Sequence, residues 1–148
     1  MGSVSDALGR RVYLDINIII YAIEGFADYA DKIKALLEAL DAAEIIAVTS
    51  ELTLAEVLVK PLKDGNLTIG QVYKDFLSPT PVFDVAPVSR EVLESAAECR
   101  ASVGLKLPDA IHWATFQSRS CDSFLTNDES FRSLQTSGVK ILSEIEFK

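Results

Sequence analysis

Four acidic residues, Asp15, Glu56, Asp109 and Asp128, have the residue type and the placement to form one metal site. They lie far apart along the chain, so they can meet only if the fold gathers them. A hard cation such as Mg²⁺ prefers oxygen ligands and is usually held by one or two carboxylates together with substrate phosphate. Such an ion relieves the repulsion among clustered acids and can stabilise charge developing on a phosphate. We therefore expect a divalent-cation site.

The elements that must position these acids can be predicted from hydrophobic pattern and capping signals. Short apolar segments rich in β-forming residues predict five strands, at residues 11–15, 44–49, 82–85, 123–126 and 139–142. Amphipathic or capped segments predict helices at residues 17–24, 28–42, 51–60, 68–77, 89–103 and 108–118, with a helical turn at 129–134. Pro61 is expected to end the helix at 51–60.

This alternation of strands and helices predicts an α/β fold, a three-layer α/β/α sandwich with a largely parallel central sheet of about five strands. Ligands of such sheets lie beyond the carboxyl ends of the strands. Asp15 and Asp128 stand at or just after predicted strand ends, and Glu56 and Asp109 lie on helices that can return to that edge. The fold class therefore brings the four carboxylates to one region.

Length and composition indicate one ordinary globular domain. With 148 residues, 49% hydrophobic and 24% charged, the chain can bury a core without disulfides. We expect residues 11–148 to form the domain and residues 1–10 to be an extension, either disordered or partly a cloning remnant at residues 1–3. Cys99 and Cys121 lack metal or redox spacing and are expected as reduced thiols. Every apolar run is shorter than the ~20 residues of a membrane span. A cytoplasmic location without membrane contact is predicted.

The net charge of −8 is unusual for a protein that binds nucleic acid, since a basic face is the usual electrostatic footprint. Two interpretations remain open from composition. Either the protein does not bind nucleic acid, or its carboxylates are concentrated at a cation site and the metal carries phosphate binding.

Four segments resemble the PIN domain, and more narrowly the VapC-like toxin ribonuclease of type II (VapBC) toxin–antitoxin pairs. They are residues 12–22 (VYLDINIIIYA), 53–57 (TLAEV), 107–114 (LPDAIHWA) and 124–131 (FLTNDESF). Each motif is weak alone, but all four occur in order and together span nearly the whole chain. The resemblance implies an RNA-cleaving enzyme that uses Mg²⁺ or Mn²⁺.

The resemblance also implies roles for the acids. Asp15 at the first strand and Asp109 at the start of its helix are expected to ligate the metal directly. Glu56 is expected to contribute from the helix after the second strand. Asp128 is expected to close the site after the fourth strand, directly or through water. All four are thus expected as catalytic and metal-binding residues.

Two further positions, Asn17 and Thr126, stand where the family often has small polar residues that orient acids or water. One departure is Ile16, where many members carry Thr or Ser, so a hydroxyl is missing. We expect a modest effect, because Asp15 and Asn17 flank this position.

Each acid also has a simpler structural interpretation. Asp15 could cap the following helix, Asp109 could complement a helix dipole, Glu56 could be solvated, and Asp128 could belong to a turn. The only histidine, His112, could act as a general base. It lies on a helix with a packing face, so we expect it in the core or behind the acids instead.

We therefore predict hydrolysis of phosphodiester bonds in single-stranded RNA or RNA loops. The resemblance implies an antitoxin partner, whose cationic segment would suit an acidic surface, and a homodimer. One alternative is a non-catalytic PIN-like binding or scaffold module. Another is an acidic α/β signalling domain, but receivers need an acidic pair at the first strand, and here Ile16 and Asn17 follow Asp15. An aspartyl phosphatase would need a second acid where Asn17 stands.

Overall fold

The central element of the fold is a five-stranded sheet. The computed structural model describes residues 3–147. Its strands are β1 (Arg11–Leu14), β2 (Ile46–Ser50), β3 (Phe83–Ala86), β4 (Ser123–Thr126) and β5 (Val139–Ile141). They are ordered β3-β2-β1-β4-β5, and all neighbouring pairs run parallel. This confirms the predicted α/β class with a parallel sheet of about five strands.

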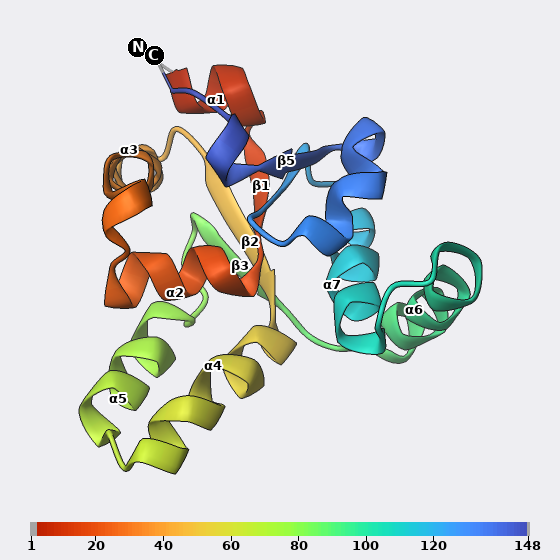
Figure 1. Ribbon diagram of the computed structural model, residues 1–148, viewed down its shortest axis with the longest axis horizontal. Helices are drawn as coiled ribbons and strands as arrows, with labels where there is room; N and C mark the ends of the chain where they lie inside the picture. Colours follow the sequence, from red (N-terminus) through yellow and green to blue (C-terminus); the bar gives the residue numbers. More distant parts are fainter. Residues whose placement is uncertain (1–2, 148) are drawn as a thin grey trace.

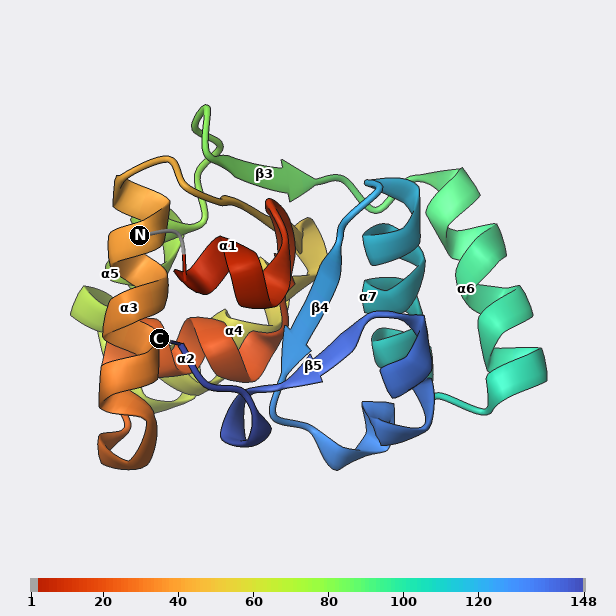
Figure 2. The same cartoon turned by 90° about the horizontal axis from the view of Figure 1, so that it is seen from above.

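Helices cover both faces of the sheet. They are α1 (Ser3–Leu8), α2 (Ile16–Glu24), α3 (Ala30–Asp41), α4 (Glu51–Asp64), α5 (Leu67–Phe76), α6 (Arg90–Val103) and α7 (Leu107–Ser118), with 3₁₀ turns η1 (Ala27–Tyr29), η2 (Glu129–Ser137) and η3 (Leu142–Glu144). Figures 1 and 2 show α2, α3, α4 and α5 on one side of the sheet and α6 and α7 on the other. None of the helices described between residues 3 and 147 is long and apolar enough to cross a membrane.

The direction of the chain explains why the helices divide in this way. From β1 the strands proceed to β2 and β3 in one direction across the sheet, and the chain then returns past β1 to β4 and β5. Crossovers between parallel strands are almost always right-handed, so a reversal of direction moves the connecting helices to the opposite face. The reversal makes the carboxyl end of β1 the switch point, where α/β sheets bind ligands.

Alternate residues of the central strands enter two separate cores. Val12 and Leu14 of β1 and Leu125 of β4 pack into the core on the side of α2 and α3. Tyr13 of β1 and Phe124 of β4 point the other way, into the core formed with α6 and α7. Because both faces of the strands are buried, their sequences are nearly continuous apolar runs, as is usual for parallel sheets.

The N-terminal segment differs from the extension expected over residues 1–10. Residues 3–8 form α1, in which Val4 and Leu8 are 4% and 1% exposed and join the core on the α2 side. The hydroxyl of Ser123 in β4 donates to the Leu8 carbonyl at 2.5 Å. The spacing of Val4 and Leu8 by one helical turn gives this short helix an apolar stripe to bury. Met1 and Gly2, part of the suggested cloning remnant, lie outside the described residues.

The predicted end of a helix before Pro61 is wrong, because α4 continues through Pro61 to residue 64. Pro61 removes one helical hydrogen bond but is buried, and its ring lies next to Gly70 of α5. The helix ends instead at Gly65, which adopts the left-handed conformation, and the Asn66 amide then donates to the Pro61 carbonyl at 2.9 Å. Packing between α4 and α5 thus overrides the local signal.

Candidate active site

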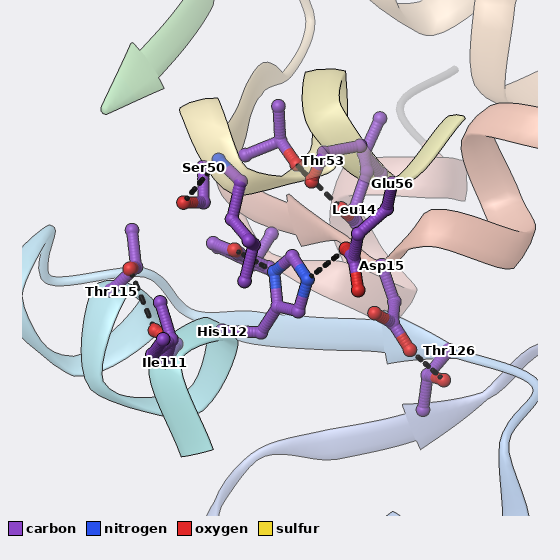
Figure 3. Close-up of polar contacts among 12 residues, drawn as sticks. Leu14, Asp15, Ser50, Thr53, Glu56, Ile111, His112, Thr115 and Thr126 are labelled. Atoms are coloured by element: carbon purple, nitrogen blue, oxygen red, sulfur yellow. Dashed lines mark hydrogen bonds and ion pairs between the residues drawn. The ribbon is translucent and has the colours of Figure 1, made fainter. Parts of the chain in front are cut away.

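Asp15 is the first residue after β1 and stands at the switch point of the sheet. It precedes α2 at the N-cap position, but its side chain makes no capping hydrogen bond. Its Oδ2 accepts a 2.7 Å hydrogen bond from the Thr126 hydroxyl, as Figure 3 shows. The whole residue is only 2% exposed, and its buried Oδ1 has no hydrogen-bond partner among the described residues. Simple helix capping therefore does not explain this side chain.

Glu56 projects from α4 toward α7 and meets the only histidine. Its Oε1 lies 2.6 Å from His112 Nε2, and the other ring nitrogen, Nδ1, lies 2.7 Å from the Tyr13 hydroxyl. His112 is 1% exposed, whereas the Glu56 side chain is 25% exposed. Figure 3 shows the ring of His112 directed at Glu56, with Asp15 beyond it. The expectation that His112 lies in the core or behind the acids is confirmed.

Asp109 and Asp128 line one cleft of about 330 Å³. Its lining residues come from the end of α6, the segment that joins α6 to α7, the first turn of α7, and η2 with its N-cap: Val103, Gly104, Leu105, Lys106, Asp109, Asp128, Ser130 and Ser133. Asp109 stands in the first turn of α7, after Pro108. Asp128 caps η2, because its Oδ1 accepts hydrogen bonds from the amide and hydroxyl of Ser130 at 2.9 and 2.8 Å. The turn role of Asp128 is therefore real, but it uses one carboxylate oxygen.

The two accessory positions connect the acids to one another. The Thr126 hydroxyl, which donates to Asp15, also accepts from the Asp128 amide at 3.0 Å. The Asn17 Oδ1 accepts from the Asn127 amide at 3.0 Å and so ties α2 to the segment after β4. Both residues fix the relative position of elements that carry site acids. A role in orienting water stays a prediction.

Asp109 lies within electrostatic range of the other three acids. Burial raises the pKa of Asp109, and the charges of the other three acids raise it further, while His112 lowers it. Burial also raises the pKa of Asp15, although His112 and Thr126 oppose the shift. Burial by itself would lower the pKa of His112, but the hydrogen bond to Glu56 and the neighbouring acidic charges together raise it. The edge of the sheet is thus a region of concentrated negative charge.

The residues at this edge of the sheet supply carboxylate oxygens, the kind of ligand that a hard cation such as Mg²⁺ prefers. Among residues 3–147, no three His, Cys, Asp or Glu side chains converge closely enough to enclose a metal ion. Mg²⁺ does not require such a cage, since it keeps several waters and usually takes one or two carboxylates from the protein. The unpaired Oδ1 of Asp15 is a suitable ligand atom, because a buried polar atom without a partner is costly and rare.

The structure brings all four sequence-predicted acids to one end of the sheet, with Asn17 and Thr126 beside them. The feature that sequence reasoning missed is the series of contacts from Tyr13 through His112 to Glu56. A partial signal existed, because His112 follows Asp109 by one helical turn. Glu56 could not be inferred as the partner of His112, since their contact depends on how α4 and α7 approach each other beyond the carboxyl end of the sheet.

Fold and site together define an α/β domain with an acidic centre at the carboxyl edge of a parallel sheet. The sequence profile of the PIN domain matches residues 12–136. The chain therefore belongs to the PIN domain family, whose members are generally nucleases.

Three solved structures share this fold over nearly their whole length. A toxin–antitoxin complex from Klebsiella pneumoniae has a TM-score of 0.68 and 28% identity, covering 90% of this chain and 99% of that chain. VapBC2 from Rickettsia felis, bound to a promoter DNA fragment, has a TM-score of 0.68 and 18% identity, covering 88% and 98%. VapBC-5 from Mycobacterium tuberculosis has a TM-score of 0.55 and 23% identity, covering 88% and 96%. The search of curated proteins finds no match.

Proposed function

We propose that this chain is a metal-dependent endoribonuclease and the toxin of a VapBC-type toxin–antitoxin pair. The observation that carries the proposal is the buried, unpaired Oδ1 of Asp15 at the switch point of a PIN-family sheet, within electrostatic range of Asp109 and Asp128. A protein has little reason to bury an ionisable group with an unsatisfied oxygen unless a ligand pairs with it.

The chain's own residues would divide the work as follows. Asp15 and Asp109 are the direct ligands of Mg²⁺ or Mn²⁺, and Glu56 and Asp128 complete the acidic site. When bound, the ion stabilises charge that develops on the attacked phosphate and increases the acidity of water. Thr126 fixes one oxygen of Asp15 by its hydrogen bond and leaves the other available.

The open side of the site is the cleft between α6, α7 and η2, and we infer that RNA enters there. Asp109 and Asp128 line this cleft together with Lys106, which offers a cation to a phosphate beside the acids. Since the chain as a whole carries a net charge of −8, phosphate binding would depend on the bound metal and on such local bases. Single-stranded RNA or an RNA loop is the substrate class.

A cognate antitoxin is the proposed protein partner. All three similar structures described above come from toxin–antitoxin or VapBC systems. Four large apolar side chains are exposed on α4 and α5, namely Val59, Leu62, Leu67 and Val72. Such a surface is typical of protein contacts. A cationic antitoxin segment would also suit the acidic surface.

Two further proposals come from the family resemblance: the toxin forms a homodimer, and it acts in the cytoplasm. The dimer is tested by the molar mass of the purified chain from light scattering, which should be twice the 16.2 kDa of one chain. A single-chain mass across the accessible concentration range would contradict it.

Cleavage of total cellular RNA tests the proposed activity. The wild-type chain with Mg²⁺ or Mn²⁺ should produce defined new ends that sequencing can map, and EDTA should prevent them. Asp15→Asn and Asp109→Asn should abolish cleavage with unchanged circular dichroism. Cleavage by both variants at the wild-type rate would refute the assigned site. A wild-type chain that binds no Mn²⁺ and cuts no RNA would favour a non-catalytic PIN-like module.

A further inference from the structure

His112 is buried in a position where a polar ring needs a specific reason to be present. It is 1% exposed and lies on the face of α7 that packs against Tyr13 of β1 and the core on that side. Both of its ring nitrogens are engaged, Nε2 with Glu56 Oε1 at 2.6 Å and Nδ1 with the Tyr13 hydroxyl at 2.7 Å. Nothing in the proposed metal chemistry uses this ring directly.

The chemistry of the three groups fixes the direction of the hydrogen bonds. A carboxylate only accepts, so Nε2 must carry a proton and donate it to Glu56. In the neutral ring Nδ1 is then an acceptor, and the Tyr13 hydroxyl must donate to it. Tyr13 itself is fully buried and stacks on Phe124 with ring centroids 5.0 Å apart. The Glu56 carboxylate thus sets the tautomer of the ring, and a rigid strand residue fixes its orientation.

We propose that His112 is a positioning residue that holds the Glu56 carboxylate in the acidic site, and that Tyr13 fixes the orientation of the His112 ring. Glu56 lies on α4, on the opposite side of the sheet from α7, which carries His112. Its long side chain is 25% exposed, so its own packing does not immobilise it. The bond from His112 anchors one oxygen and leaves the other on the side of Asp15, as Figure 3 shows. The inference rests on the proposed function for its catalytic meaning.

The arrangement matches a general pattern in which partners behind the ligands orient them. Removal of such partners typically costs metal sites about 10–100-fold in affinity or activity. A purely packing role would predict something different, since a leucine would fill the same buried space without a polar atom. The positioning role requires the hydrogen-bond donor at Nε2, whereas the packing role requires only the volume of the ring. The substitutions below change these two properties separately.

Cleavage kinetics test the positioning role with matched variants. His112→Leu removes the donor and should lower kcat for RNA cleavage about 10–100-fold with little change in KM. His112→Gln keeps an amide donor near the Nε2 position and should recover most of that loss. Thr115→Val is the control on the same helix, because the buried Thr115 hydroxyl donates only to the Ile111 carbonyl one turn back. Its kcat should stay at the wild-type value.

Nuclear magnetic resonance gives a readout that does not depend on activity. His112 is the only histidine, so one imidazole appears in a long-range ¹H–¹⁵N spectrum of the metal-free, full-length protein. The spectrum should show the Nε2–H tautomer with a protected, downfield-shifted ring proton. Glu56→Ala should remove that protection, and Tyr13→Phe, which keeps the stacked ring, should shift the Nδ1 resonance, because Nδ1 loses its hydrogen-bond donor, while the Nε2–H tautomer is kept.

Each outcome decides between the alternatives. Wild-type cleavage by His112→Leu, or equal inactivity of folded His112→Leu and His112→Gln, would overturn the positioning role while leaving the ribonuclease intact. An Nδ1–H tautomer, or a ring signal insensitive to Glu56→Ala, would overturn it even if His112→Leu fails to fold. If the wild type cuts no RNA, the proposed function fails, and the spectrum still decides whether His112 holds Glu56.

Discussion

At the scale of single residues, the site combines buried acids with too few internal partners. Asp15 loses hydration on folding and recovers one hydrogen bond at Oδ2, whereas Oδ1 recovers none within the described residues. Asp109 is less buried, but it experiences the charges of three other carboxylates. Sites that combine burial with like charges are where functional groups are expected, and the proposed cation would relieve their opposition to folding.

The shifted pKa of Asp109 leads to a prediction about the metal-free protein. Its folded-state pKa is raised above 3.8, so the folded protein binds this proton more tightly than the unfolded chain does. The group's favourable effect on stability is therefore complete below about pH 4 and is lost as pH rises through the folded pKa. Asp109→Asn should be more stable than the wild type in EDTA at pH 7, with a difference that shrinks toward pH 4.

Urea unfolding in EDTA from pH 4 to pH 8 measures this difference, and Mg²⁺ should then stabilise the wild type more than the variant. A variant less stable than the wild type at pH 7 would show that Asp109 makes a net favourable contribution without metal. That result would remove the argument from electrostatic repulsion.

At the scale of elements, most of the site's framework was predictable from the sequence. Strand β4 and helices α6 and α7 follow from hydrophobic pattern and capping signals, and the structure has them close to the predicted bounds. The features that the sequence did not predict correctly depend on tertiary packing. Pro61 stays within α4 because α5 buries it, and the contact between Glu56 and His112 joins two residues that are 56 positions apart in the sequence.

The cap of α4 should influence the site because this helix carries Glu56. The Ser50 hydroxyl accepts from the Leu52 amide, and the Ser89 hydroxyl accepts from the Val92 amide at the start of α6. Ser50→Ala and Ser89→Ala should each cost about 1 kcal/mol of stability in urea unfolding. Only Ser50→Ala should also reduce RNA cleavage, since α6 carries none of the four acids. Equal effects on cleavage would mean that the position of α4 does not control the site.

The junction between α1 and β1 should be essential for the fold. Gly9 has a φ of +80°, and a Cβ there would lie 2.4 Å from the Cβ of Asp122, whose carboxylate accepts from the Arg10 and Arg11 amides. Gly25 has a φ of +82° with nothing near its missing Cβ. Gly25→Ala should cost about 1–2 kcal/mol from backbone conformation alone. Gly9→Ala should cost roughly 1–3 kcal/mol more, from overpacking. Equal losses of thermal stability would show that the added Cβ at Gly9 is accommodated without overpacking against Asp122.

At the scale of the whole molecule, the fold explains how an acidic chain can be a nuclease. The parallel sheet and its reversal at β1 gather acids from four distant segments at one edge, a property that follows from topology and was inferable from the order of elements. The family profile agrees with that inference. The net charge of −8 was the main objection to nucleic-acid binding, and the cation that we propose at the acidic edge would answer it.

We predict that RNA binding depends on metal. A labelled, non-cleavable RNA should bind the wild type in Mg²⁺ but only weakly in EDTA, because the chain's overall charge repels phosphate. The neutral variant Asp15→Asn should lose most of the Mg²⁺-dependent gain. Fluorescence anisotropy at constant ionic strength measures both. Tight binding in EDTA would indicate a basic surface that acts without the metal.

The central claim is that the acids at the end of β1 and around it form one divalent-metal site. Calorimetric titration of Mn²⁺ into the metal-free wild type, beside Asp15→Asn and a folding check by circular dichroism, tests it most directly. We predict saturable binding by the wild type and loss of that binding in the folded variant. Saturable binding of equal affinity by both proteins, or no binding by the wild type, would contradict the account.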